Sequence, residues 1–192
     1  MRRLLAAALT ASLAAAIAAA PAALSPEKSF SAAEKLDRIS TDSMHPGETI
    51  TLTEDEINSF LRYDYAPHMP DGVRDLTVQL QPDRGVAHAF VDLAKLQAST
   101  GSSLGLLWNA VLSGEREIAV TCRYVSANGQ ATVEILSAEL NGTSIPKPVL
   151  DWLVGSVVAE HFAGVELGKP SPLPNNLKQI ELQTDQALIT SY

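Results

Sequence analysis

Alternation of apolar and polar residues constrains this chain more than any other feature of its sequence. Leu76, Val78 and Leu80 alternate with polar residues, a pattern typical of a β-strand with one buried face. Further alternating or apolar stretches of strand length follow at residues 86–92, 118–124, 133–140, 177–184 and 186–191. The sequence therefore predicts a domain made mainly of strands.

The residues between these stretches indicate how the strands are joined. A Pro-Asp-Arg-Gly turn occupies residues 82–85, and Asn-Gly pairs stand at 128–129 and 141–142. Asn-Gly is the strongest short hairpin signal, because both residues tolerate a positive φ. Tight turns connect antiparallel strands, so the pattern predicts an antiparallel sheet.

Two stretches are predicted as helices. After a short strand at residues 49–52, Thr53 and Glu56 match a helix capping box. A second helix is expected at 147–162, where apolar residues cover most of the circumference and imply burial on more than one side. Residues 104–112 are densely apolar and fit either a short helix or a lid-like loop. We therefore expect an α+β fold: one curved antiparallel sheet packed on one face by two main helices, in a single domain.

The N-terminus has the layout of a secretory signal. Arg2 and Arg3 precede an Ala-rich apolar run over residues 4–20, and Ala20-Pro21-Ala22 supplies small residues for cleavage after Ala22. The predicted organisation is a signal peptide at 1–22, an N-terminal arm or tether at 23–48 and the α+β domain at 49–192. The expected location is the periplasm or the exterior, and an uncleaved N-terminal anchor is the alternative.

Charge excludes some partners. The chain has 14 Lys and Arg against 22 Asp and Glu, a formal charge of −8, and removal of the signal with its two arginines makes this −10. No nucleic-acid partner is expected, and any membrane contact would not use a basic patch. The single cysteine, Cys122, cannot form an internal disulfide.

One motif suggests an enzyme. Gly101-Ser102-Ser103-Leu104-Gly105 matches the nucleophile pattern of serine hydrolases, and Asp151 and His161 follow in the expected order. However, Asp151 and His161 are ten residues apart on one predicted helix, about 15 Å along its axis, which is too far for a hydrogen bond. We expect a flexible Gly/Ser loop, no catalytic residues and no enzyme activity.

Neither a metal nor a cofactor is expected. The four histidines stand at 45, 68, 88 and 161, and no pair has a spacing typical of zinc ligands. The sequence has no phosphate-binding loop and no dinucleotide fingerprint.

Large apolar residues exceed what one sheet face of such a domain readily covers. One interpretation is a packed core, which would suit an envelope assembly or scaffold protein with a protein partner. The other is an apolar groove between sheet and helices for a lipid or another small apolar ligand. The residues predicted to line this groove are Phe60, Leu61, Trp108, Trp152, Leu153 and Val157.

Three segments resemble the YpmS-like and LmeA-like bacterial envelope proteins. They are Ile50-Thr51-Leu52-Thr53-Glu54-Asp55-Glu56-Ile57-Asn58, then Leu140-Asn141-Gly142-Thr143-Ser144-Ile145-Pro146 before the apolar helix, and the terminal hairpin after Leu173-Pro174. The resemblance spans about residues 48–191. It implies a curved sheet wrapped around helices, related to tubular lipid-binding domains. It also implies a non-enzymatic role in handling lipids or envelope precursors, with no catalytic residues to assign.

Overall fold

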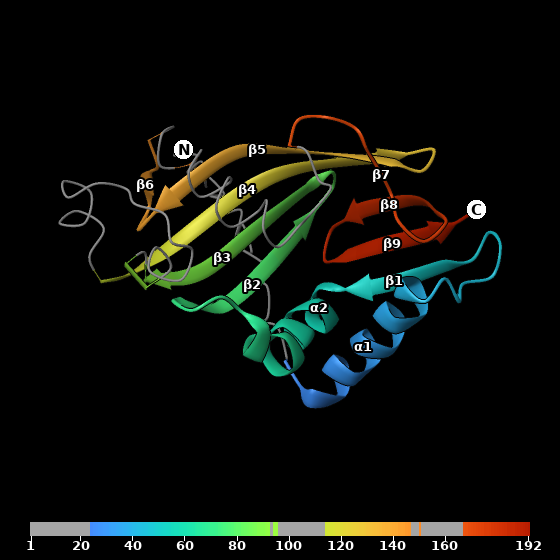
Figure 1. Cartoon of the computed structure of the whole chain (residues 1–192), viewed down its shortest axis with the longest axis horizontal. Coiled ribbons are helices and arrows are strands. Elements are labelled where there is room, and N and C mark those ends of the chain that lie inside the picture. The colour runs from blue at the N-terminus through green and yellow to red at the C-terminus, as the bar shows by residue number, and fades with distance from the viewer. Residues whose placement is uncertain (1–23, 93, 96–113, 147–149, 151–166) are drawn as a thin grey trace, which may run out of the picture.

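The strands belong to two antiparallel sheets. A computed structural model describes residues 24–92, 94–95, 114–146, 150 and 167–192. Within these residues the chain has an α+β fold, in which both sheets are open and two helices lie beside them (Figure 1). The predicted fold class is confirmed, but the strands are divided between two sheets and not placed in one.

The larger sheet follows the order of the sequence. Its strands are β2 (Val73–Gln81), β3 (Arg84–Asp92), β4 (Glu115–Ala127), β5 (Gln130–Leu140) and β6 (Thr143–Ser144), with β7 (Ser171–Pro172) paired to the start of β5. The predicted turns are present: Asn128 and Gly129 have φ values of 52° and 75°, as a tight hairpin requires.

The smaller sheet brings the two ends of the domain together. Its order is β1 (Thr49–Thr53), β9 (Gln186–Ser191) and β8 (Leu177–Gln183). Ile50 of β1 lies opposite Ile189 of β9, so the last strand of the chain stands between the first strand and its own hairpin partner. Strand pattern alone does not specify this pairing across almost the whole sequence, which is why one sheet was expected.

Helix α1 (Pro26–Ser40) occupies much of the segment predicted as an N-terminal arm or tether at residues 23–48. The Ser25 side chain accepts a hydrogen bond from Lys28 N, and Pro26 stands in the first turn, where it needs no N–H partner. Ala32 of this helix is completely buried. This segment is therefore packed into the domain.

Helix α2 (Glu54–Phe60) begins where the capping box predicts. Thr53 Oγ accepts a hydrogen bond from Glu56 N at 3.3 Å, and Glu56 accepts one from Thr53 N at 2.9 Å. A π-helical turn, η1 (Leu61–Tyr65), and a short 3₁₀ turn, η2 (Ala66–His68), continue it. The second predicted helix, at 147–162, lies almost entirely outside the described residues.

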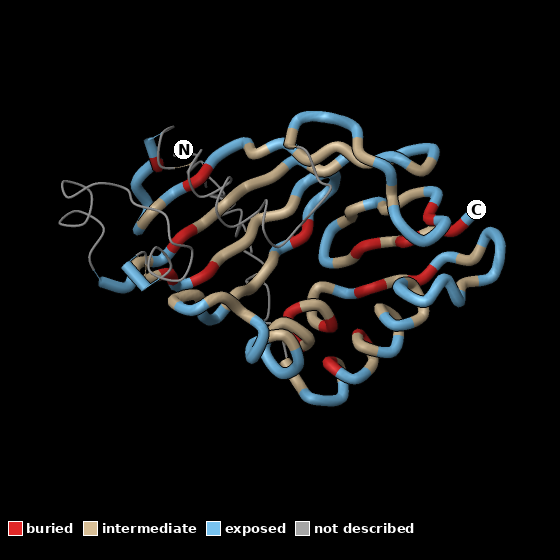
Figure 2. Tube along the Cα trace, viewed as in Figure 1, coloured by how far each residue is buried: buried red, intermediate tan, exposed pale blue. Residues whose placement is uncertain are grey.

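The buried side chains form two clusters, one for each sheet (Figure 2). The first cluster, on the larger sheet, contains Ala89, Val91, Ile118, Ala138 and Ile145. The second joins α1 to the smaller sheet and contains Ala32, Leu52, Leu177 and Ile189. Each sheet thus has its own core.

Candidate ligand-binding site

The larger sheet has one apolar face. Residues directly opposite one another on antiparallel strands point to the same side. The register places Val78, Ala87, Val120 and Ala138 in one row across four strands. The neighbouring row on the opposite side, Thr77, His88, Ala119 and Glu139, is mainly polar. We call the first side the apolar face.

The apolar face is turned towards the smaller sheet. Ser126, which lies on this face, donates a hydrogen bond to Ile180 O of β8 and accepts one from Ile180 N, both at 2.7 Å. Two backbone hydrogen bonds support the junction, from Gly129 N to Lys178 O and from Asp83 N to Leu182 O. The smaller sheet is therefore fixed at the hairpin end of β4 and β5.

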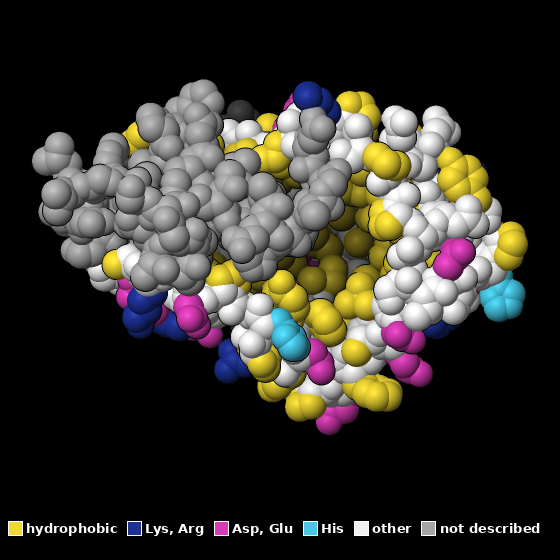
Figure 3. Space-filling model, in the orientation of Figure 1, with side chains coloured by type: hydrophobic (Ala, Val, Ile, Leu, Met, Phe, Trp, Pro, Cys, Tyr) yellow, Lys and Arg dark blue, Asp and Glu magenta, His cyan; other side chains and the backbone are white. Residues whose placement is uncertain are grey.

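Between this junction and the first cluster, the residues that the structure describes cover the apolar face only in part. The side chains in this stretch are all only half-buried: Val120, Cys122, Tyr124, Val133 and Ile135. Figure 3 shows a hollow lined by hydrophobic side chains between the two sheets. A sheet face packed against a close-fitting core would instead exclude water from such side chains.

Burial affects two titratable groups on this face. Burial raises the pKa of the Cys122 thiol. Burial also raises the pKa of Tyr124, against a smaller opposing effect of its hydrogen bond with Ser126. Both groups are therefore neutral at neutral pH, so this stretch offers a ligand apolar contact with a few neutral polar atoms.

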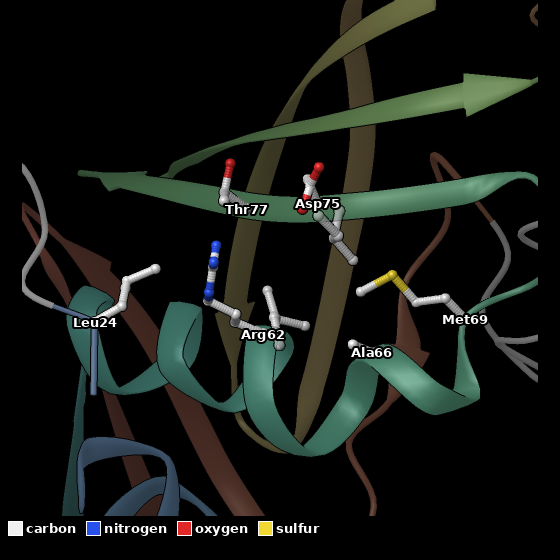
Figure 4. A pocket seen from close by; sticks show the side chains of 8 residues that line it. Leu24, Arg62, Ala66, Met69, Asp75 and Thr77 are labelled. Carbon is white, nitrogen blue, oxygen red and sulfur yellow. The ribbon is translucent and has the colours of Figure 1, made fainter. Parts of the chain in front are cut away.

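A smaller cleft lies at the other edge of the larger sheet, between η1 and β2 (Figure 4). We call it the η1–β2 cleft. It has a volume of about 70 Å³ and is lined by Leu24, Leu61, Arg62, Ala66, Met69, Asp75, Leu76 and Thr77. An apolar cavity of about 150 Å³ holds one benzene molecule, so this cleft is too small for an acyl chain.

The residues predicted to line a groove are only partly described. Phe60 packs against the second cluster, whereas its neighbour Leu61 lines the η1–β2 cleft. Trp108, Trp152, Leu153 and Val157 lie outside the described residues, as do Ser103, Asp151 and His161 of the hydrolase-like pattern. The groove assignment for these residues remains a prediction.

Sequence reasoning recognised the strands of the apolar face but named none of their residues as part of the site. The signal was available, because Val120, Cys122 and Tyr124 alternate with polar residues. Such alternation shows only that one side of a strand avoids water. It does not show whether protein or a ligand covers that side.

The described part of the chain gives no sign of a metal centre or a membrane span. No three His, Cys, Asp or Glu side chains among these residues are grouped so that they could hold a metal ion. No helix in the same residues is both long enough and apolar enough to cross a bilayer.

The part of the chain that the structure describes is an α+β domain whose apolar sheet face is covered only in part by those residues. Comparison with known proteins adds no relative: no family model matches this chain, and no curated protein matches it. The resemblance to the YpmS-like and LmeA-like proteins therefore remains a prediction.

Proposed function

We propose that this chain is a non-enzymatic exported protein that binds an apolar ligand, a lipid, in the space between its sheets and helices. The observation that supports this most is the half-buried stretch of the apolar face beside a hollow lined by hydrophobic side chains. The signal-like N-terminus supports export.

Removal of apolar surface from water would drive this binding. An acyl chain gains about 0.8 kcal/mol for each methylene group that leaves water, and the apolar face gains similarly when a ligand covers it. A lipid that crosses an aqueous compartment needs this cover along its chain. The neutral Cys122 and Tyr124 add no charge that would oppose binding.

The first experiment is native mass spectrometry of the full chain purified without detergent, followed by solvent extraction and lipid analysis. We expect bound lipid at close to one molecule per chain. The same intact mass tests export, because cleavage after Ala22 leaves Ala23 as the first residue.

Two matched variants locate the binding site. Ile135→Asn places an amide on the apolar face, whereas Val125→Asn makes a similar change on the opposite face, where Val125 is 48% exposed. We expect Ile135→Asn to remove most of the bound lipid and Val125→Asn to retain it. Equal retention by two folded variants would refute this site.

An apo mass for the wild-type chain would favour the alternative, a packed assembly or scaffold protein with an envelope protein partner. Reaction of Ser103 with a fluorophosphonate probe would instead favour a serine hydrolase. Both outcomes contradict the lipid-binding proposal as stated.

A further inference from the structure

The η1–β2 cleft contains a cation, Arg62, that forms no ion pair with any residue the structure describes. Arg62 is exposed and lines the cleft, and among the described residues it forms no ion pair. Figure 4 shows its side chain extending from the helical turn towards Thr77 of β2. Leu24, Leu61, Ala66, Met69 and Leu76 make the rest of the lining mainly apolar.

Asp75 is the other charged side chain of this cleft, and it already has a partner. Its carboxylate forms an ion pair with Arg74, whose guanidinium also binds Glu115 at 2.5 Å and lies 4.4 Å from the centroid of the Phe90 ring. Arg62 is therefore the charged group of this cleft that can bind an anionic ligand.

Both walls of the cleft depart from regular backbone geometry. Leu61 and Arg62 belong to the π-helical turn η1, and Asp75 lies at a bulge in β2 with a φ of 52°. Isolated π-helical turns, strand bulges and positive φ values at residues other than glycine all occur preferentially at functional sites. Here they place Arg62 and Asp75 on facing sides of one small space.

The cleft adjoins the apolar face through one residue. Leu76 lines the cleft and also packs against the first cluster. The apolar part of a ligand with its polar end at Arg62 would meet Leu76 and the other apolar side chains that line the cleft.

We propose that the η1–β2 cleft binds the oxyanion head group of an amphiphile, a carboxylate or a phosphate, through Arg62. This inference rests on the proposed function and specifies its ligand class. The guanidinium suits such a group because its planar N–H donors match two oxygens of a carboxylate or a phosphate. The cleft volume of about 70 Å³ exceeds several-fold the roughly 15 Å³ that one water molecule requires, so a small oxyanion can enter it.

The test compares ligands that share one chain and differ in the head group. Isothermal titration calorimetry of the delipidated full chain uses dodecanoate, dodecyl phosphate, dodecanol and dodecyltrimethylammonium, each below its micellar concentration. We expect at least one anion to bind about tenfold more tightly than dodecanol, as charge-assisted hydrogen bonds allow. The stronger anion identifies a carboxylate or a phosphate ligand.

Three variants test whether Arg62 causes the preference for an anionic head group. Arg62→Gln should reduce affinity for the preferred anion about tenfold and leave dodecanol unchanged. Asp75→Asn, which retains a residue tolerant of positive φ, should strengthen anion binding by removing a nearby negative charge. Arg84→Gln is the control, because Arg84 is also exposed and forms no ion pair among the described residues.

The outcomes separate the two proposals. If dodecanol binds as tightly as the anions and Arg62→Gln changes nothing, the head-group site is wrong while apolar binding stands. Tighter binding of dodecyltrimethylammonium than of the anions also refutes the proposed head-group site. If no compound binds to the folded chain, the proposed function fails as well. Urea midpoints show that each variant is folded.

Discussion

At the scale of single residues, Glu56 is the most informative side chain. It is 8% exposed and accepts hydrogen bonds from Lys35 Nζ at 2.6 Å, from Ser31 at 2.7 Å and from Thr53 N at 2.9 Å. Burial raises its pKa, but these hydrogen bonds and the Lys35 charge outweigh burial and lower the pKa from 4.5 to about 2. One carboxylate thereby joins α1, β1 and α2.

The lowered pKa predicts a dependence of stability on acid. Glu56 stabilises the fold when ionised, so its contribution is complete above about pH 4.5 and is lost as the pH falls towards 2. The difference corresponds to about 3 kcal/mol. We expect the free energies of unfolding of wild type and Glu56→Gln in urea to converge between pH 5 and 2. Glu34→Gln, at an exposed site on α1, is the control, and parallel curves for wild type and Glu56→Gln would contradict the prediction.

At the scale of elements, side chains occupy positions where a neighbouring strand would otherwise pair. Asn58 of α2 donates from Nδ2 to Val78 O at 2.8 Å and accepts from Val78 N at 2.7 Å, as the backbone of an adjacent strand would. Glu54 accepts from Leu80 N at 2.7 Å. Helix α2 therefore covers the open edge of β2, which would otherwise be available for aggregation.

Removal of the Asn58 amide should destabilise the domain. Asn58 is 4% exposed, so Asn58→Ala leaves two buried backbone groups of Val78 without partners. We expect a loss of about 2–4 kcal/mol in the free energy of unfolding, measured in urea. Gln79→Ala, at an exposed position of the same strand, should change this value by less than about 0.5 kcal/mol. Equal effects of the two substitutions would show that Asn58 has no special role.

Ser126 joins the two sheets in a similar way. Ser126→Ala removes both hydrogen bonds to Ile180 and should cost about 1–2 kcal/mol. Native-state hydrogen exchange gives the sharper measurement. The Ile180 amide should exchange faster in the variant, while the Ile189 amide in the middle of the same sheet should change less. Unchanged exchange at Ile180 would mean that the remaining contacts hold the sheets together.

At the scale of the whole molecule, the space between the two cores can be probed through the only cysteine. Cys122 lies half-buried on the apolar face, so an apolar ligand bound there should protect it from a small alkylating reagent. At a ligand concentration about nine times Kd, about a tenth of the sites remain free and alkylation should slow about tenfold. The measurement is the alkylation rate with and without dodecanol.

The control for this prediction moves the thiol to the other face. A double variant, Cys122→Ser with Val125→Cys, presents a single thiol where Val125 is exposed. Its alkylation rate should not depend on the ligand. Equal protection of both thiols would place the ligand elsewhere or indicate a general change in the fold.

The candidate site could be predicted only in part. Leu61 was assigned from helical spacing to a lipid groove; it lines the η1–β2 cleft, and the groove assignment stays a prediction. Arg62, beside it in sequence, was not assigned, because nothing in the sequence shows that a bulge at Asp75 faces that helical turn. The same limit applies to Val133 and Ile135, whose partial exposure depends on where the smaller sheet is fixed.

The sequence by itself determined the local elements of this protein. The alternation around Val78 and Val120, the Asn128-Gly129 turn and the Thr53 capping box each specify structure through neighbouring residues. The tertiary structure decided which distant strands pair, how α1 packs and how much of the apolar face the described residues cover. These features depend on contacts such as Ile50 with Ile189 and Ser126 with Ile180, which join residues far apart in the chain. Local patterns fix which side of a strand avoids water, but only the assembled molecule fixes what covers that side.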